Sequence, residues 1–229
     1  PGLERLSLAG NRLSDKTLAP LLDGLVEIQD LRSIDLSEND LDAKGAKALQ
    51  QLLAQRSCLL TEVHLRRSDV DDDECRALCE SLELNTASKL EVLDLSDNLI
   101  GQKEEVNEFN PEFQTGGEAL GAMLAATSTL TTLDLSWNSI RGTSAKALAS
   151  AVKANATLTL LNLSHNRLDE DGGVAVADAL EANTSLTEVR LAHCFIGAKG
   201  SIVLSQALTE RATPLTVVDF AGNVPGRVG

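Results

Sequence analysis

Aliphatic residues recur along this chain in one arrangement, Leu-x-x-Leu-x-Leu-x-x-Asn-x-Leu. Its eight copies begin at Leu3, Leu31, Leu60, Leu90, Leu130, Leu158, Leu186 and Leu215. The alternation of apolar and polar residues in Leu-x-Leu is typical of a half-buried strand. Eight short strands are therefore predicted, and their regular spacing indicates a solenoid of stacked repeats.

A second apolar pattern follows every strand except the last. Small and aliphatic residues recur there at three- and four-residue steps, as in residues 144–152, which predicts a helix with one packed face. Seven such helices are expected, because the eighth copy breaks down at Pro225. Adjacent parallel strands lie ~4.8 Å apart, whereas helices need about 10 Å, so the stack must bend.

We therefore expect an α/β solenoid shaped like a horseshoe, with a parallel sheet on the concave face and helices on the convex face. It is expected to be a single domain over residues 1–229, with eight repeats of which the last is truncated. The Asn of each repeat can bond turn groups that would otherwise be buried and unpaired. Ser68 and Cys194 replace it in two copies, so Cys194 is interpreted as structural rather than reactive.

One repeat is longer than the others. Neighbouring copies begin 28 to 30 residues apart, but Leu90 and Leu130 are 40 residues apart. The surplus forms an insertion at about residues 102–115, on the strand-to-helix side, and it contains Phe109 and Phe113. Insertions in solenoids leave from loops and often carry function. The alternative is a tolerated insertion whose Phe side chains pack locally.

The unit of about 28 residues, followed by Gly-Ala-x-Ala-Leu at residues 45–49, resembles the ribonuclease-inhibitor class of leucine-rich repeats. That class includes ribonuclease inhibitor, the sensor regions of NOD-like receptors, the Ran GTPase-activating protein, tropomodulin-like actin regulators and repeat subunits of ciliary axonemes. The resemblance covers essentially the whole chain, and it implies a horseshoe and a role in binding. The run at residues 133–138 is most similar to the intracellular-receptor and ciliary members.

Two columns of residues are expected on the concave face, because they alternate with the core leucines. The first column is Ser7, Asp35, His64, Asp94, Asp134, Asn162, Arg190 and Asp219. The second column, directly before each Asn position, is Gly10, Glu38, Arg67, Asp97, Trp137, His165, His193 and Gly222.

The only Trp of the chain, Trp137, lies in the second column and is expected to face solvent. An exposed Trp among polar groups is typical of a protein-binding hot spot, although it could instead lie flat and shield the turns. Asp94 and Asp134 should lie side by side and raise each other's pKa unless a cation intervenes. The predicted partner-binding residues are Arg66, Arg67, Asp94, Asp97, Phe109, Phe113, Asp134, Trp137, His165 and His193.

Charge narrows the choice of partner. The formal net charge is -14, so the chain should repel nucleic acid and anionic membrane surfaces. A protein with a basic or mixed surface is the expected partner, although acidity also favours solubility by itself. No phosphate-binding Gly-rich loop and no catalytic set of side chains is recognisable in the sequence, so no enzymatic activity and no cofactor are expected.

Cysteine spacing indicates neither a disulfide framework nor a paired zinc motif, which favours a reducing, cytoplasmic compartment. The acidic run that starts at Asp69 resembles a calcium loop, but Glu74 stands where a Gly is needed. His165 and His193 lack a third ligand, so no metal site is predicted. The sequence carries no signal peptide and no apolar run long enough to span a bilayer, and it starts without Met, which predicts part of a longer chain or larger complex.

The leading hypothesis is a protein-interaction module that binds through its concave face and the insertion. A structural subunit of a cytoskeletal or axonemal assembly is the first alternative, and a cytoskeletal or ciliary location would accompany it. A GTPase-activating role, as the resemblance to the Ran GTPase-activating protein allows, is the second.

Overall fold

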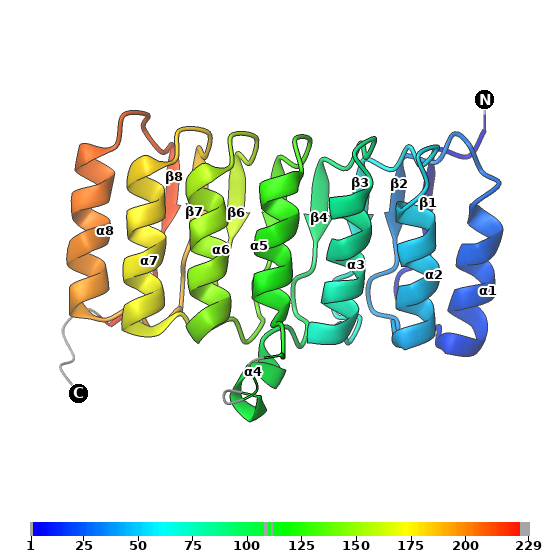
Figure 1. The fold of residues 1–229 in the computed structure, drawn as a ribbon, viewed down its shortest axis with the longest axis horizontal. Helices are drawn as coiled ribbons and strands as arrows, with labels where there is room; N and C mark the ends of the chain where they lie inside the picture. The colour runs from blue at the N-terminus through cyan, green and yellow to red at the C-terminus, as the bar shows by residue number, and fades with distance from the viewer. Residues whose placement is uncertain (1, 108–109, 111, 225–229) are drawn as a thin grey trace.

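The computed structural model describes residues 2–107, 110 and 112–224. Within these ranges, eight strands form one parallel sheet whose order follows the sequence from β1 to β8. The helices form a second layer on one face of this sheet, so that strand and helix alternate along an extended row (Figure 1). The predicted α/β solenoid is confirmed. We call the sheet face that points away from the helices the concave face.

The strands are β1 Arg5–Ser7, β2 Ser33–Asp35, β3 Glu62–His64, β4 Val92–Asp94, β5 Thr132–Asp134, β6 Leu160–Asn162, β7 Glu188–Arg190 and β8 Val217–Asp219. The helices are α1 Asp15–Leu25, α2 Ala43–Leu53, α3 Asp72–Leu84, α4 Gln102–Val106, α5 Gly116–Ala126, α6 Gly142–Ala154, α7 Asp169–Ala182 and α8 Ala198–Glu210. Among the described residues, seven helices follow the repeat pattern. The remaining helix, α4, lies inside the insertion and projects from the edge where strands lead into helices (Figure 1).

Each strand pairs with the next so that equivalent residues of the repeat lie directly opposite one another. The central residues therefore form one apolar row: Leu6, Ile34, Val63, Leu93, Leu133, Leu161, Val189 and Val218. The six inner members of this row are at most 3% exposed, because the helices cover them. The core is thus a thin continuous layer between sheet and helices, as an aliphatic sequence with few aromatic residues requires.

A ladder of buried Asn side chains joins the repeats just beyond the strands. Asn138 shows its geometry, with Nδ2 donating to the carbonyl oxygens of Leu135 in its own repeat and Leu95 in the preceding one, at 3.1 and 2.9 Å. Its Oδ1 accepts from the backbone N–H of Ile100 at 3.0 Å. Since one amide bonds groups of two repeats, each Asn fixes the position of its own repeat relative to the preceding one.

Both replacements in the ladder keep the side-chain bond to a carbonyl of the preceding repeat, while their backbone carbonyls take over as acceptors. The Ser68 hydroxyl donates to the carbonyls of Leu36 and Arg66, both at 3.3 Å. The Cys194 thiol lies 3.0 Å from the carbonyl oxygen of Leu163, and burial raises its pKa to about 11. A buried thiol that is protonated at neutral pH is a poor nucleophile, which agrees with the structural interpretation of Cys194.

A second ladder, which the sequence analysis missed, lies where each helix returns toward the next strand. Three buried Asn side chains each donate to a carbonyl near the end of the helix one repeat earlier: Asn85, Asn155 and Asn183. At the equivalent place after α8, the Arg211 guanidinium donates to the carbonyl oxygens of Leu180 and Leu186 at 2.5 and 2.6 Å. The first ladder therefore bonds backbone groups where strands lead into helices, and the second bonds those where helices lead back to strands.

Replacing Asn138 by Ala should leave the buried N–H of Ile100 without its acceptor and remove the bonds that the amide donates to Leu95 and Leu135. Those two carbonyl oxygens keep their bonds from Asn98 and Asn166. One unpaired buried group costs roughly 1–3 kcal/mol, so we expect the free energy of unfolding to fall by about 3 kcal/mol once the lost bonds are added. Urea denaturation of the two proteins measures this change. The matched control is Asn11→Ala, because Asn11 is exposed and bonds only carbonyls of its own repeat. Equal effects at both positions would contradict a ladder that links repeats.

Candidate functional site

The second concave column has an unusual backbone. All eight of its residues adopt a left-handed conformation, with φ between 50° at Arg67 and 70° at Gly10 and Gly222. Six of them are not Gly, and this conformation costs such residues about 1–2 kcal/mol each. The cost is offset by backbone bonds that extend the sheet ladder, such as the N–H of Trp137 donating to the carbonyl of Ser164 at 2.9 Å. The column is therefore held rigidly at a regular spacing.

Three aromatic side chains of this column form a stack across three repeats. The rings of Trp137 and His165 are 3.7 Å apart between centroids and tilted by 10°. The rings of His165 and His193 follow at 4.6 Å and 19°. Trp137 is 56% exposed, so the prediction that it faces solvent is confirmed. One face of the indole is covered by the ring of His165.

The stack is uncharged at its centre at neutral pH. Partial burial lowers the pKa of His165 below its usual value of 6.5, and the nearby His193 lowers it further. A neutral imidazole packs on the indole through dispersion and ring electrostatics alone. The paired rings of Trp137 and His165 thus offer a neutral aromatic surface within an acidic protein.

An ion pair lies next to the stack in the same column. Arg67 donates to Oδ2 of Asp97 from Nε and from Nη2, both at 2.9 Å. Arg66 precedes it and is also exposed, with its backbone N–H donating to the Ser37 hydroxyl at 3.2 Å. An exposed pair of this kind contributes little to stability, so these side chains remain available to a ligand.

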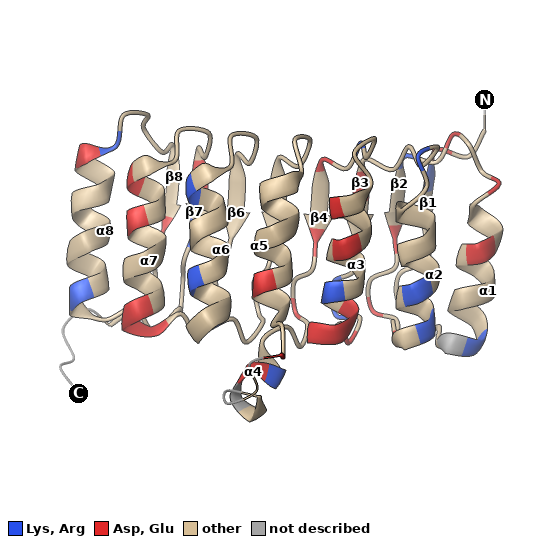
Figure 2. Ribbon diagram, in the orientation of Figure 1, with Lys and Arg blue, Asp and Glu red and all other residues tan. Residues whose placement is uncertain are grey.

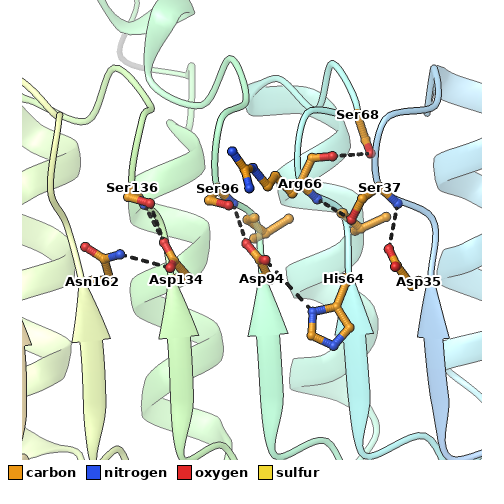
Figure 3. A network of polar contacts seen from close by, with 12 residues as sticks. Asp35, Ser37, His64, Arg66, Ser68, Asp94, Ser96, Asp134, Ser136 and Asn162 are labelled. Atoms are coloured by element: carbon orange, nitrogen blue, oxygen red, sulfur yellow. Dashed lines mark hydrogen bonds and ion pairs between the residues drawn. The ribbon is translucent and has the colours of Figure 1, made fainter. Parts of the chain in front are cut away.

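Several members of the first concave column make polar contacts, which are drawn in Figure 3. His64 lies 3.9 Å from the carboxylate of Asp94, and Asn162 donates to Asp134 at 2.9 Å (Figure 3). Asp94 and Asp134 are register partners, as expected. Each carboxylate, however, has a polar partner on its far side, His64 for Asp94 and Asn162 for Asp134.

The expected rise in the pKa of Asp94 is wrong. Burial does act to raise its pKa, but the contact with His64 and the hydrogen bond from Ser96 outweigh burial and leave the pKa below its usual value. His64 lies on the side of Asp94 away from Asp134, so it does not come between the two carboxylates. The same contact acts on the histidine, because the nearby carboxylate of Asp94 raises the pKa of His64 despite partial burial.

The insertion is tied to the solenoid by an acidic run at the start of α3, in the preceding repeat (Figure 2). The fully buried carboxylate of Asp72 accepts from the backbone N–H groups of Gly101, Lys103 and Gly116 at 3.0, 3.0 and 2.7 Å. The ammonium of Lys103 also pairs with Asp71 at 2.7 Å and with Asp73. Both stems of the insertion are therefore clamped by one carboxylate. The sequence analysis weighed this run only as a calcium loop and set that reading aside, although an acidic run just before a long repeat was the available signal.

The insertion also contacts the repeat that follows it. Oε1 of Glu104 accepts from the backbone N–H and the hydroxyl of Thr143 at 2.6 and 2.7 Å, which places a carboxylate at the N-terminus of α6. That position is favourable because the helix dipole is positive there. A hollow of about 600 Å³ lies between the insertion and α6, and its lining includes Phe113, Arg141 and Lys146.

These contacts separate the two parts of the expected binding surface, the concave face and the insertion. The lining of this hollow includes Phe113 but not Trp137, and Phe109 lies outside the described residues. Glu104 anchors the insertion to α6, whereas Trp137 stacks toward His165 in the next repeat. Within the described chain, the predicted residues thus form a concave group around Trp137 and a separate edge hollow at Phe113. The sequence analysis also missed Phe195, which is 66% exposed and follows His193 by two positions.

Metal binding finds no support among the described residues, where no group of three or more His, Cys, Asp or Glu side chains could hold an ion. Cys58, Cys75, Cys79 and Cys194 are all free thiols. The contact with Cys79, together with burial, raises the pKa of Cys75 well above its usual value. In the part of the chain that the structure describes, no helix is long and apolar enough to cross a membrane.

Comparison with known proteins identifies the repeats. The Leucine Rich repeat family model matches residues 28–49, 127–149, 154–177 and 182–205, which fall on the second, fifth, sixth and seventh repeats. Ribonuclease inhibitors of Sus scrofa and Mus musculus are each 31% identical over 99 residues, which is 43% of this chain and 21% of theirs. The matched part of the chain thus spans about a fifth of the length of these relatives. Protein NLRC5 of Mus musculus is 41% identical over 59 residues, 26% of this chain and 3% of that protein.

Two solved structures are also similar. Leiomodin-1 actin-binding site 2 aligns with a TM-score of 0.45 at 22% identity, over 75% of this chain and 76% of that one. InlP of Listeria monocytogenes aligns with a TM-score of 0.41 at 20% identity, over 86% of this chain and 40% of that one.

Substitution of Asp72 by Ala should release both stems of the insertion, since three backbone N–H groups lose their acceptor. We expect faster amide hydrogen exchange over residues 101–116 and a loss of roughly 1–3 kcal/mol in stability. Mass spectrometry after peptic digestion measures the exchange. In Asp73→Ala, which removes only surface ion pairs, the exchange should stay near that of the unmodified protein. Unchanged exchange in Asp72→Ala would show that the clamp is unnecessary.

The histidines should titrate in a defined order. We expect the pKa of His64 to lie above 6.5 and that of His165 below it, because the contact with Asp94 favours the charged form of His64. Stabilisation by the pair with Asp94 should be full below pH 6.5 and lost as the pH rises through the raised pKa of folded His64. NMR titration resolves this order, since the chain has 3 His. Asp94→Asn should lower the pKa of His64 and leave that of His165 in place.

Proposed function

We propose that this chain, a leucine-rich-repeat protein of the ribonuclease-inhibitor type, binds another protein through its concave face and acts as an interaction module rather than an enzyme. The observation that carries the proposal is the exposed Trp137 held in a stack of three rings. Tryptophan is enriched at the residues that dominate protein–protein affinity. Because the stack is already ordered, binding would cost little side-chain entropy.

Polar groups around the stack support the same surface. The pair of Arg67 and Asp97 lies beside it in the second column, and Asp94 and Asp134 lie in the first. Charged groups at the edge of an apolar contact set its orientation and exclude wrong partners more than they add affinity. The net charge of -14 favours a partner with a basic or mixed surface.

The edge hollow at Phe113 is proposed as a second contact for the same partner, separate from the stack. A groove walled by an insertion on a rigid scaffold is a frequent place for recognition. The free thiols support a further proposal, that the protein works in a reducing compartment such as the cytoplasm.

Affinity capture from the source cell lysate, followed by mass spectrometry, tests the concave surface. The double variant Trp137→Ala with His165→Ala should lose a dominant partner by at least about tenfold, since hot-spot residues each contribute ~2 kcal/mol or more. The control is Leu84→Ala, which removes an apolar side chain that is 82% exposed on α3 of the opposite layer. Circular dichroism should show that both variants remain folded.

Two results would contradict the proposal. Capture of the same partner by the double variant and by the unmodified protein would place binding elsewhere. Recovery of many subunits of one large assembly, insensitive to either variant, would instead favour the structural-subunit alternative.

A further inference from the structure

The indole of Trp137 has one covered face and one open face. His165 covers the first at 3.7 Å. On the other side the next member of the column is Asp97, whose backbone N–H donates to the carbonyl of Ser136 at 2.8 Å and so brings the two turns together. A carboxylate side chain is much shorter than an indole. The outer ring of Trp137 therefore extends past Asp97, in agreement with its 56% exposure.

The carboxylate beside this open face has unused bonding capacity. Both bonds from Arg67 go to Oδ2 of Asp97, and no described residue donates to Oδ1. A carboxylate can accept about four hydrogen bonds, so a second donor group can share it with Arg67. A ligand at this place would thus meet an aromatic face on one side and a free carboxylate oxygen on the other.

The chemistry that uses both features is a flat cation. A guanidinium group stacks face to face on an indole and gains roughly 0.5–2 kcal/mol from the attraction of cation and ring. The N–H groups of a guanidinium lie in its plane and can bond a carboxylate in pairs. A lysine ammonium is a compact charge that stacks less well on an indole and bonds a carboxylate with less specific geometry. Neutral His165 on the far face does not oppose a cation, and the acidic chain attracts one.

We propose that the open face of Trp137, together with Asp97, receives an arginine side chain of the partner protein. The proposal rests on the proposed function and names the chemistry that the concave surface recognises. The structure already holds one guanidinium on Asp97, that of Arg67, which shows that the carboxylate is accessible to such a group. An aromatic or proline side chain could use the indole but would leave the charge of Asp97 unused.

The fluorescence of the protein reports directly on this site, because the chain has 1 Trp and 0 Tyr. The probes are synthetic Gly/Ser peptides that differ at one central residue, which is arginine, citrulline, lysine or phenylalanine. Citrulline keeps the shape of arginine and lacks its charge. We expect the arginine peptide to bind about tenfold more tightly than the citrulline peptide, the equivalent of one charge-assisted bond. The indole N–H signal of Trp137 in NMR spectra should shift with the same dissociation constant.

Variants of the two charged neighbours make the test specific. Asp97→Asn should lower the affinity for the arginine peptide by about tenfold and leave the affinity for the phenylalanine peptide unchanged. Arg67→Gln should raise the affinity for the arginine peptide several-fold. The substitution removes a side chain that competes for Asp97 and a positive charge that repels the arginine of the peptide. The matched control is Glu91→Gln, which removes one exposed carboxylate from the same repeat and should change affinity by less than about twofold.

Three results would overturn the inference: equal binding of the arginine and citrulline peptides, tighter binding of the phenylalanine peptide, or weaker arginine binding in Arg67→Gln. Capture of the partner from lysate distinguishes failure of the arginine proposal from failure of the proposed function. If Asp97→Asn retains the partner that the Trp137 and His165 double variant loses, the concave surface is right and arginine recognition is wrong. If the peptides bind as expected but the double variant retains the partner, the recognition chemistry holds and the assigned binding surface is wrong.

Discussion

Burial of one amide side chain in every repeat is the constraint on which this structure depends. The turn that leaves each strand presents backbone groups that the packed repeats cut off from water, and unpaired groups there would be costly. Asn138 bonds groups of its own repeat and of the repeat before it, so that adjacent turns must lie in register. The left-handed residue before each Asn follows from the same requirement, because it brings the amide under the turn while its own N–H extends the ladder.

That constraint has a consequence for function. Residues such as Trp137 and His165 are held at the spacing of the repeats, which is close to the spacing at which aromatic rings stack. A binding surface can therefore be encoded one residue per repeat, without effect on the core beneath. The first column uses the same regularity for polar contacts, where His64 lies against Asp94 and Asn162 donates to Asp134.

Electrostatic contacts between repeats were the harder part to foresee. The 40-residue spacing between Leu90 and Leu130 places the insertion in the fourth repeat, but nothing local indicates which side chains hold it. Asp72 bonds the start and the end of the insertion, and these sites are 29 and 44 positions away in sequence. The direction in which the insertion leans is likewise set by Glu104 at α6. Such pairings depend on the stacking of repeats, which local periodicity does not describe.

The sequence by itself determined the solenoid, the number and order of its strands, the buried rows and the membership of both concave columns. It could do so because one residue pattern, repeated at nearly constant spacing, dictates which side chains are apolar, which bond the turns and which face outward. Only the tertiary structure decided how neighbouring repeats use those side chains. It stacked Trp137 on His165, placed His64 beside Asp94 on the side away from Asp134, and joined the insertion to the start of α6. The physical reason is that ring stacking and ion pairing depend on distances of a few ångströms between residues far apart in sequence.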